Sequence, residues 1–298
     1  MLEGFKTQTI TVADTEIFVR TAGTGYPVLL IHGFPQTGAC WHRIAPTLAE
    51  RFSVVVPDLR GYGASGKPAP SHDHAPHSKR AMARDLVEVM AALGHERFAV
   101  VGHDRGARVG FRLTMDHPER VSRFCSLDVI PTLEMWEKLD LAGAVGGFHW
   151  SFLAQPAPVP ETLIGADPDF FYGYLMRKWA APEFLFDPHA MGAYLEAMRD
   201  PAVIAGTCED YRAGAGIDVA HDRDDREAGR KLACPLLFLY GGVRGFGGPG
   251  GPADPLDTWR NWCDGEVTGG AVPCGHFLPE EAPGTVLEQL LPFLMDDT

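Results

Sequence analysis

A sharp turn from strand to helix at residues 102–106 narrows the choice of fold more than any other stretch. The apolar run 98–101 ends in Gly102-His103-Asp104-Arg105-Gly106, and a helical pattern continues from there through residue 117. Flanking glycines let the backbone bend this sharply and leave the central side chain exposed at the corner. The pattern is that of a nucleophile elbow with aspartate where serine is commoner. An ordinary strand–helix junction can also contain aspartate, so the rest of the chain must supply the context.

Short apolar runs alternate with helical patterns along most of the chain. A hairpin is expected at residues 9–20, further strands at 26–31, 52–57, 97–102, 123–128, 235–240 and near 267, and helices ending near 50, at 78–93, at 255–263 and up to 295. The runs at 26–31 and 52–57 do not alternate in polarity, as expected for strands buried on both faces. Repeated βα units predict an α/β fold, with a mostly parallel sheet and helices on both faces.

The alternation stops between residues 132 and 221. This segment has a helical apolar pattern, is rich in aromatic residues and contains no strand-like run. We expect a helical cap, 132–221, inserted into an α/β core made of 1–131 and 222–298. A chain of 298 residues with 45% hydrophobic residues is long enough to bury such a core.

Charge and cysteine usage exclude several classes of partner. The formal net charge of −13 argues against nucleic acid and anionic membranes, because both are bound through basic patches. No apolar run is long enough to span a membrane, and the first residues lack the pattern of a secretion signal. The six cysteines are scattered without a C-x-x-C pair, which indicates reduced thiols in a cytoplasmic protein.

Three stretches have competing interpretations as cofactor or metal sites. Residues 61–66 match the dinucleotide fingerprint G-x-G-x-x-G, but the helix that this fingerprint needs is replaced by Lys67-Pro68-Ala69-Pro70. The histidine-rich stretch 71–77 fits a loop better than a metal tract. The glycine-rich stretch 241–251 lacks the Gly-Lys-Ser/Thr ending of a phosphate loop and is expected to form a flexible rim of the site. We expect no metal and no organic cofactor.

The candidates for a catalytic triad follow the chain order nucleophile, acid, histidine. His276 lies after the last strand, where the base falls in this order. The acid is either Asp128, at the end of the strand after the elbow helix, or Asp254, and spacing leaves both open. His32-Gly33-Phe34-Pro35 ends the strand expected beside the elbow strand, so the backbone N–H groups of Phe34 and Arg105 can form an oxyanion hole.

An aspartate nucleophile changes the chemistry of this frame. A carboxylate attacks an electrophilic sp³ carbon and forms an alkyl ester, which histidine-activated water then hydrolyses. Displacement of halide and opening of an epoxide both suit this scheme. Arg105 and Arg108 follow the nucleophile on the first turn of the helix, whereas Arg112 is expected on the surface. Two arginines beside the nucleophile favour a substrate that carries its own carboxylate, namely a short 2-halo acid.

Nearly the whole chain resembles the α/β-hydrolase fold, and Gly102-His103-Asp104-Arg105-Gly106-Ala107-Arg108 resembles the fluoroacetate dehalogenases in particular. Haloalkane dehalogenases and many epoxide hydrolases usually carry Trp where this chain has Arg105. Phe148-His149-Trp150 and Glu209-Asp210-Tyr211-Arg212 are similar to the cap segments that supply the halide-binding residues of that family.

The resemblance implies a role for each matching residue. Asp128 would be the triad acid, and Arg105 and Arg108 would bind the substrate carboxylate. His149, Trp150 and Tyr211 would donate to the halide, and imidazole, indole and phenol can do so without adding a competing nucleophile. Trp179 would line the cap pocket. The resemblance also implies a homodimer.

Two alternatives to a haloacetate dehalogenase are kept open. In an epoxide hydrolase, Tyr172, Tyr174 or Tyr211 would protonate the epoxide oxygen. In a catalytically idle binding protein with a hydrolase fold, the two arginines would only capture a small carboxylate. Halide release from fluoroacetate and chloroacetate separates the three functions.

Overall fold

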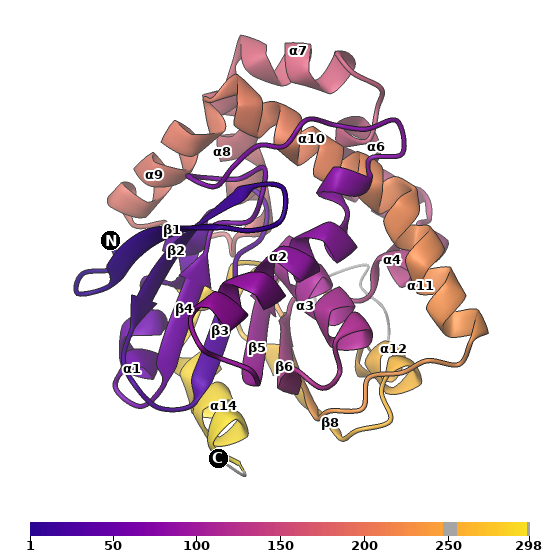
Figure 1. Ribbon diagram of the computed structural model, residues 1–298. Helices are drawn as coiled ribbons and strands as arrows, with labels where there is room; N and C mark the ends of the chain where they lie inside the picture. The colour runs from indigo at the N-terminus through magenta and orange to yellow at the C-terminus, as the bar shows by residue number, and fades with distance from the viewer. Residues whose placement is uncertain (247–254, 297–298) are drawn as a thin grey trace.

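The centre of the computed structural model, which describes residues 1–246 and 255–296, is an eight-stranded sheet (Figure 1). The strands are β1 (Lys6–Thr11), β2 (Glu16–Ala22), β3 (Pro27–Ile31), β4 (Ser53–Pro57), β5 (Phe98–His103), β6 (Val121–Leu127), β7 (Leu236–Gly241) and β8 (Val267–Val272). Their order is β1-β2-β4-β3-β5-β6-β7-β8. β2 pairs antiparallel with β1 and β4, and every other pairing is parallel. The predicted α/β fold with a mostly parallel sheet is confirmed.

Helices cover both faces of this sheet. The helical elements are η1 (Gly38–Trp41), α1 (Ala45–Ala49), η2 (Ala75–His77), α2 (Lys79–Ala92), α3 (Arg105–Asp116), α4 (Thr132–Glu137), α5 (Leu141–Gly146), α6 (Phe148–Leu153), α7 (Val159–Ala166), α8 (Pro168–Trp179), α9 (Pro188–Met198), α10 (Pro201–Ala215), α11 (Ile217–Glu227), α12 (Pro255–Trp262), α13 (Leu278–Glu281) and α14 (Pro283–Met295). The buried side chains of α2, α3 and α12 belong to one hydrophobic cluster, and those of α1 and α14 belong to a second.

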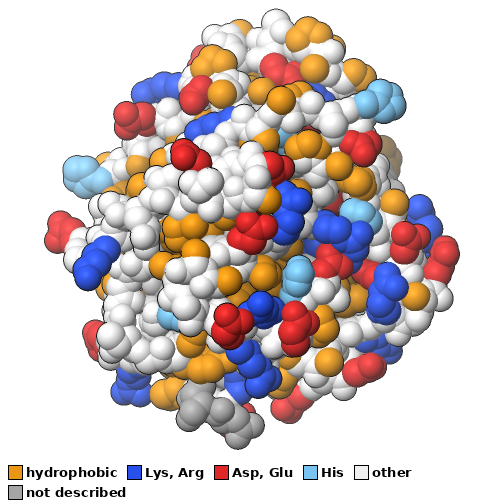
Figure 2. Space-filling view, in the orientation of Figure 1, with side chains coloured by type: hydrophobic (Ala, Val, Ile, Leu, Met, Phe, Trp, Pro, Cys, Tyr) orange, Lys and Arg blue, Asp and Glu red, His pale blue; other side chains and the backbone are white. Residues whose placement is uncertain are grey.

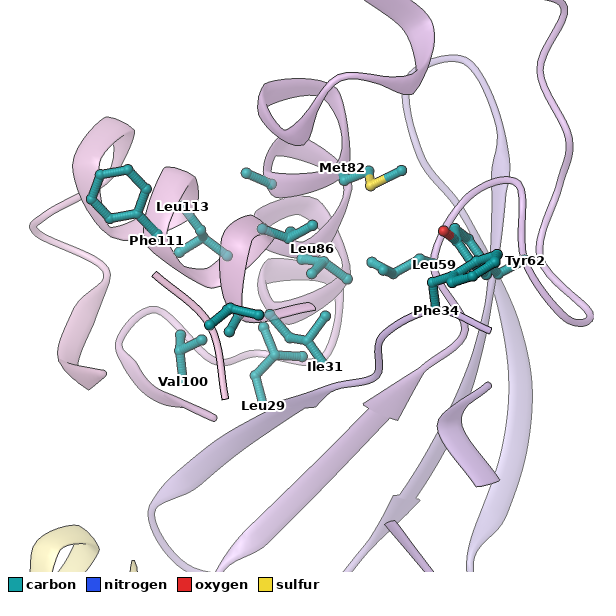
Figure 3. Close-up of a cluster of buried hydrophobic side chains, with 14 of the residues drawn as sticks. Leu29, Ile31, Phe34, Leu59, Tyr62, Met82, Leu86, Val100, Phe111 and Leu113 are labelled. Carbon is teal, nitrogen blue, oxygen red and sulfur yellow. The ribbon is translucent and has the colours of Figure 1, made fainter. Parts of the chain in front are cut away.

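The two clusters explain why the central strands lack alternating polarity. In β3, Leu29 and Ile31 belong to the first cluster, whereas Val28 and Leu30 belong to the second. Successive side chains of a strand point to opposite faces, so a strand covered on both sides is apolar throughout. Figure 3 shows part of the first cluster. Phe111 of α3 lies at one side of the view, and Phe34, Leu59 and Tyr62 lie at the opposite side.

The segment between β6 and β7 is helical, from α4 through α11. In Figure 1, helices α7 to α10 lie above one end of the sheet. The cap was expected to end at residue 221, but α11 continues to Glu227 without a break. Asp222 and Asp225 of this helix pair with the buried Arg112 of α3, so the last turns of α11 pack against the core.

Several sequence expectations concern surface and metal-binding properties. Figure 2 shows acidic and basic side chains interspersed over the visible face. Within 1–246 and 255–296, no helix is long and apolar enough to cross a membrane. The same ranges contain no group of three or more His, Cys, Asp or Glu side chains placed to hold a metal ion. All six cysteines are described, and they are free thiols. Asp254 and the stretch 247–251 of the glycine-rich segment lie outside the described residues.

Candidate active site

Asp104 occupies the sharp turn between β5 and α3. Its backbone has φ 49° and ψ −122°, a region that non-glycine residues rarely adopt. Close packing of the flanking glycines permits this turn: a Cβ on Gly106 would lie 2.3 Å from the carbonyl oxygens of Ile31 and His32. The elbow is therefore pressed against the end of β3, the strand from which Phe34 follows.

Backbone N–H groups hold the carboxylate of Asp104. The N–H of Phe34 donates to Oδ1 of Asp104 at 2.8 Å. Burial raises the pKa of Asp104, but His276, His103 and a hydrogen bond from the Arg105 backbone N–H together bring it below the ordinary value. Asp104 is thus ionised at neutral pH, and its carboxylate accepts from both backbone N–H groups that the sequence suggested as an oxyanion hole.

His276 lies between two carboxylates. Its Nδ1 is 2.6 Å from Oδ2 of Asp128, and its Nε2 is 3.7 Å from Oδ2 of Asp104. Asp128 is fixed by the backbone N–H of Gly241, which donates to its Oδ1 at 2.8 Å. Burial lowers the pKa of His276, but the hydrogen bond and charge of Asp128 raise it above the ordinary value of 6.5. The imidazole therefore has one nitrogen oriented by Asp128 and the other directed toward Asp104.

The two arginines after Asp104 are both buried but have different partners. Nε of Arg105 donates to Oδ2 of Asp210 at 2.9 Å and Nη2 donates to Oδ1 at 2.6 Å, which leaves Nη1 without a partner. Arg108 donates from Nη1 to the carbonyl of Ile130 at 2.6 Å, and its Nε is unpartnered. Burial, followed by the charge of Arg105, lowers the pKa of Arg108 to about 10. Unpartnered guanidinium N–H groups beside a carboxylate nucleophile suit an anionic group on a substrate.

Arg112 was expected on the surface, and this prediction is wrong. Its guanidinium is buried and ion-paired with Asp116 at 3.1 Å, Asp222 at 2.8 Å and Asp225 at 2.6 Å. The two latter carboxylates come from α11, more than a hundred positions later in the chain. Local sequence around Arg112 carries no sign of these distant partners.

Three aromatic side chains of the cap form a cluster beside the two arginines. The rings of His149, Trp150 and Tyr211 lie edge-on to one another, with centroids 6.3 Å apart for His149 and Trp150 and 5.8 Å apart for the other two pairs. Trp150 also packs 4.7 Å from the guanidinium of Arg108. Burial lowers the pKa of His149 to about 3, so this imidazole is neutral. The cluster thus contains neutral N–H and O–H groups, which suit an anion displaced from a substrate carbon that Asp104 attacks.

The cap also contacts the loop that carries His276. The ring of Trp179 lies 4.6 Å from that of His149 and 5.7 Å from that of His276, measured between centroids. The backbone N–H of His276 donates to the carbonyl of Trp179 at 3.0 Å. Trp179 therefore lies between the aromatic cluster and the histidine.

Two of the three tyrosines considered as epoxide-protonating groups pack against Phe34, the residue whose N–H donates to Asp104. The pKa of Tyr211 is raised by burial and then by the charge of Asp104. The rings of Tyr172 and Tyr211 both lie edge-on to that of Phe34, with centroids 5.8 Å and 5.1 Å away. Tyr174 is exposed and stacks on Phe170.

Two residues near this site were not identified from the sequence. Asp210 pairs with Arg105, and Glu281 accepts backbone hydrogen bonds from Gly275 at 2.7 Å, Phe277 at 2.8 Å and Ala181 at 2.9 Å. The partners of Asp210 are side chains far away in the sequence, and those of Glu281 are backbone N–H groups. The only local sign was that Asp210 precedes Tyr211 within the segment that carries the resemblance.

The fold and this arrangement around Asp104 define an α/β hydrolase. Residues 26–283 match the family model described as the alpha/beta hydrolase fold. An α/β hydrolase from Nostoc sp PCC 7120 superposes with a TM-score of 0.95 at 46% identity, covering 99% of each chain. The chain therefore shares this fold over nearly its whole length.

Curated relatives narrow the classification further. Fluoroacetate dehalogenase from Burkholderia sp is 43% identical over 297 residues, covering 99% of this chain and 96% of the relative. A soluble epoxide hydrolase from Corynebacterium sp. (strain C12) is 33% identical, covering 92% of this chain and 91% of the relative. The protein belongs to the haloacetate dehalogenase family of the α/β-hydrolase superfamily.

Proposed function

We propose that this hydrolase of carbon–halide bonds acts on short 2-halo acids, converting a haloacetate such as fluoroacetate to glycolate and halide. The observation that carries the substrate class is the pair of buried guanidinium groups beside Asp104, each with an unpartnered N–H. A haloacetate carries one carboxylate two bonds away from its halogen. Arg105 and Arg108 can hold that carboxylate while the α-carbon faces Asp104.

The first step forms an ester on Asp104. Oδ1 accepts a hydrogen bond from Phe34, so Oδ2 is the oxygen that attacks the α-carbon. The new bond joins Oδ2 to this carbon, and the carbon–halogen bond breaks with its electron pair leaving on the halide. His149, Trp150 and Tyr211 donate to the departing halide, and because they are neutral they add no charge that would retain it.

The second step hydrolyses the ester. His276 takes a proton from water, and the resulting hydroxide attacks the carbonyl carbon of the Asp104 ester. Asp128 orients the imidazole and stabilises its protonated form. The tetrahedral oxyanion forms at Oδ1, which accepts from the N–H of Phe34, and the N–H of Arg105 is the second donor to this carboxyl group. As it collapses, the proton held by His276 passes to the departing alkoxide oxygen, which gives glycolate. One water-derived oxygen stays on Asp104, whose carboxyl then releases its proton to solvent. No cofactor is required for either step.

A single turnover in heavy-oxygen water tests this mechanism. Halide release from chloroacetate and fluoroacetate establishes the reaction, and mass spectrometry of the Asp104 peptide reports the path of the oxygen. We expect the label in the peptide and unlabelled glycolate after one turnover. Labelled glycolate with an unlabelled peptide would show direct attack of water on the substrate.

Epoxide hydrolysis is the second candidate, favoured by the similarity to the Corynebacterium enzyme and by Tyr211 beside Asp104. Turnover of styrene oxide without halide release from either haloacetate would support it. Tight carboxylate binding without any product would instead indicate the catalytically idle protein. The family resemblance also supports a homodimer, which light scattering after gel filtration tests.

A further inference from the structure

Asp210 of the cap is fully buried and accepts hydrogen bonds from three residues of the core. Its Oδ1 accepts from Nη2 of Arg105 at 2.6 Å and from Nζ of Lys79. Its Oδ2 accepts from Nε of Arg105 at 2.9 Å and from the hydroxyl of Tyr62 at 2.7 Å. The position of Tyr62 is in turn fixed by the hydrophobic cluster at whose end it lies (Figure 3). Asp210 thus joins α10 to three separate parts of the core.

These contacts determine the orientation of the Arg105 guanidinium. Nη2 donates a second time, to the backbone carbonyl of Asp210 at 2.7 Å, so Nε and Nη2 are both occupied. Nη1 alone has no partner. Gly214, one helical turn after Asp210, leaves room for this side chain: a Cβ there would lie 2.9 Å from Nη2 and 3.3 Å from Nη1. The same face of α10 therefore anchors the guanidinium and makes space for it.

The carboxylate of Asp210 pairs with only one of the two arginines. Burial raises its pKa, but Arg105 and Lys79 hold the pKa of this carboxyl well below its usual range, so it stays ionised. Lys79 lies 3.5 Å from a second carboxylate, Asp218. Arg108 has no ion pair with any carboxylate in the described part of the chain. The charge of Arg105 is balanced by an ion pair inside the protein. Arg108 has only the longer-range influence of Asp104 and Asp222, and its charge is uncompensated in the sense that no carboxylate of the described residues forms an ion pair with it.

We propose that Asp210 is a positioning residue for carboxylate recognition, which orients Arg105 for a single hydrogen bond from Nη1 and offsets its charge, so that Arg108 carries the one uncompensated charge. This inference rests on the proposed function, because it assumes that both arginines bind the substrate carboxylate. A site with one uncompensated cation matches a substrate with one carboxylate. With two uncompensated cations it would retain substrate and product carboxylates too strongly and orient them less well.

Two substitutions separate charge from geometry. Asp210→Asn removes the balancing charge, so acetate, an unreactive carboxylate, is expected to bind about tenfold more tightly, since an unscreened buried charge interacts strongly over a few ångströms. The kcat for chloroacetate is expected to fall by about tenfold or more, because Arg105 is no longer oriented. Gly214→Ala keeps the charge balance but displaces the guanidinium. It is expected to weaken acetate binding severalfold and to lower kcat/KM, while the helix itself gains from alanine.

Matched controls exist in the same structure. Asp222→Asn removes another buried carboxylate that joins the cap to α3, and Gly192→Ala adds a methyl group where nothing lies within 4 Å. Gly192→Ala is expected to leave acetate binding and kcat unchanged. Asp222→Asn removes a carboxylate that acts on Arg108 less strongly than Asp104 does and has no contact with Arg105, so it is expected to shift acetate affinity less than Asp210→Asn does. Calorimetric titration with acetate, chloroacetate kinetics and thermal unfolding are measured for all four variants and the unsubstituted protein.

Opposite shifts of acetate affinity in Asp210→Asn and Gly214→Ala support the proposal, whereas unchanged affinity or parallel loss in both overturns it. If Asp210→Asn does not fold, weaker acetate binding by Gly214→Ala relative to Gly192→Ala supports it and equal binding overturns it. If the unsubstituted protein releases no halide, the proposed function fails, and the acetate titrations still decide the role of Asp210. Absence of acetate binding by the unsubstituted protein overturns the proposal.

Discussion

The two oxygens of Asp104 are in different environments, and this difference assigns them different tasks in the proposed reaction. Oδ1 accepts from the Phe34 N–H at 2.8 Å, whereas Oδ2 lies 3.7 Å from Nε2 of His276. The first is placed to become the oxyanion, and the second is free to attack carbon. A carboxylate in a symmetric environment would have no such preference, and half of its encounters would place the ester oxygen away from the base.

The pH dependence of ester hydrolysis reports the state of His276. Its pKa is raised above the ordinary value of 6.5, and in the proposed mechanism the neutral imidazole is the base. The hydrolysis rate should therefore rise as the pH is raised through this pKa. Asp128→Asn removes the hydrogen bond and charge that raise the pKa. The acid limb should therefore move to lower pH, and the maximal rate should fall by on the order of 10³- to 10⁴-fold. Rapid-quench measurement of the ester over a pH series checks both changes.

Asp254→Asn serves as the control for the same measurement. Asp128 is the carboxylate that lies 2.6 Å from Nδ1 of His276, so substitution of Asp254 should leave the pH profile and the maximal rate unchanged. A larger loss in Asp254→Asn than in Asp128→Asn would move the acid to Asp254.

At the scale of elements, the loop between β8 and α13 positions His276 through its own backbone. Glu281 accepts N–H groups from Gly275 and Phe277 on this loop and from Ala181 on the cap. One carboxylate therefore ties the loop to itself and to the segment after α8. The orientation of the imidazole depends on this carboxylate as well as on Asp128.

Glu281→Gln is expected to disturb this loop. The amide group places a donor where three backbone donors converge, so kcat for chloroacetate should fall by about tenfold to a hundredfold, as small displacements of reacting groups cost that much. Glu280→Gln is the matched control. Burial raises the pKa of Glu280 to about 8, so its carboxyl is mostly neutral at pH 7 and a neutral amide replaces it with little loss. Equal losses in the two variants would contradict a positioning role for Glu281.

Elements differ in how well their sequence predicted them. The turn at Asp104 depends on glycines within two residues of it, and β3 to β8 depend on short apolar runs, so both could be predicted from local sequence. The end of the cap could not, because α11 is polar and is held by ion pairs with Arg112. The contact between Asp210 and Arg105 could not be predicted for the same reason. Pairings between residues a hundred positions apart leave no periodicity in a single sequence.

Across the whole molecule, buried ion pairs join the cap to the core at two points on α3. Arg105 pairs with Asp210 near its start, and Arg112 pairs with Asp222 and Asp225 two turns later. Helix α3 begins at the nucleophile, so the helix that positions Asp104 is also the one that holds the cap. Any change in how the cap sits is transmitted to the first turn after the elbow.

Arg112→Gln is expected to destabilise the whole fold without a direct effect on chemistry. It leaves Asp222 buried without its cation and Asp225 with Arg230 alone, and removal of one partner of a buried pair typically costs about 3–5 kcal/mol of the free energy of unfolding. Arg80→Gln is the control, since Arg80 pairs with Asp116 at the surface and such pairs contribute about 0–1 kcal/mol. Urea unfolding at neutral pH measures both. A loss below about 1 kcal/mol for Arg112→Gln would show that the buried carboxylates are readily accommodated without it.

The side chains proposed for ester formation and hydrolysis, Asp104, Asp128 and His276, all follow strands of the core, whereas the proposed halide donors all lie on α6 and α10. The proposed nucleophile and the proposed leaving-group pocket therefore lie on separate segments of the sequence. Exchange of the segment between β6 and β7 with that of a relative would graft a new leaving-group preference onto an unchanged nucleophile. The exchange would succeed only where the incoming segment carried its own counterpart of Asp210, because this carboxylate of the cap pairs with Arg105 of the core.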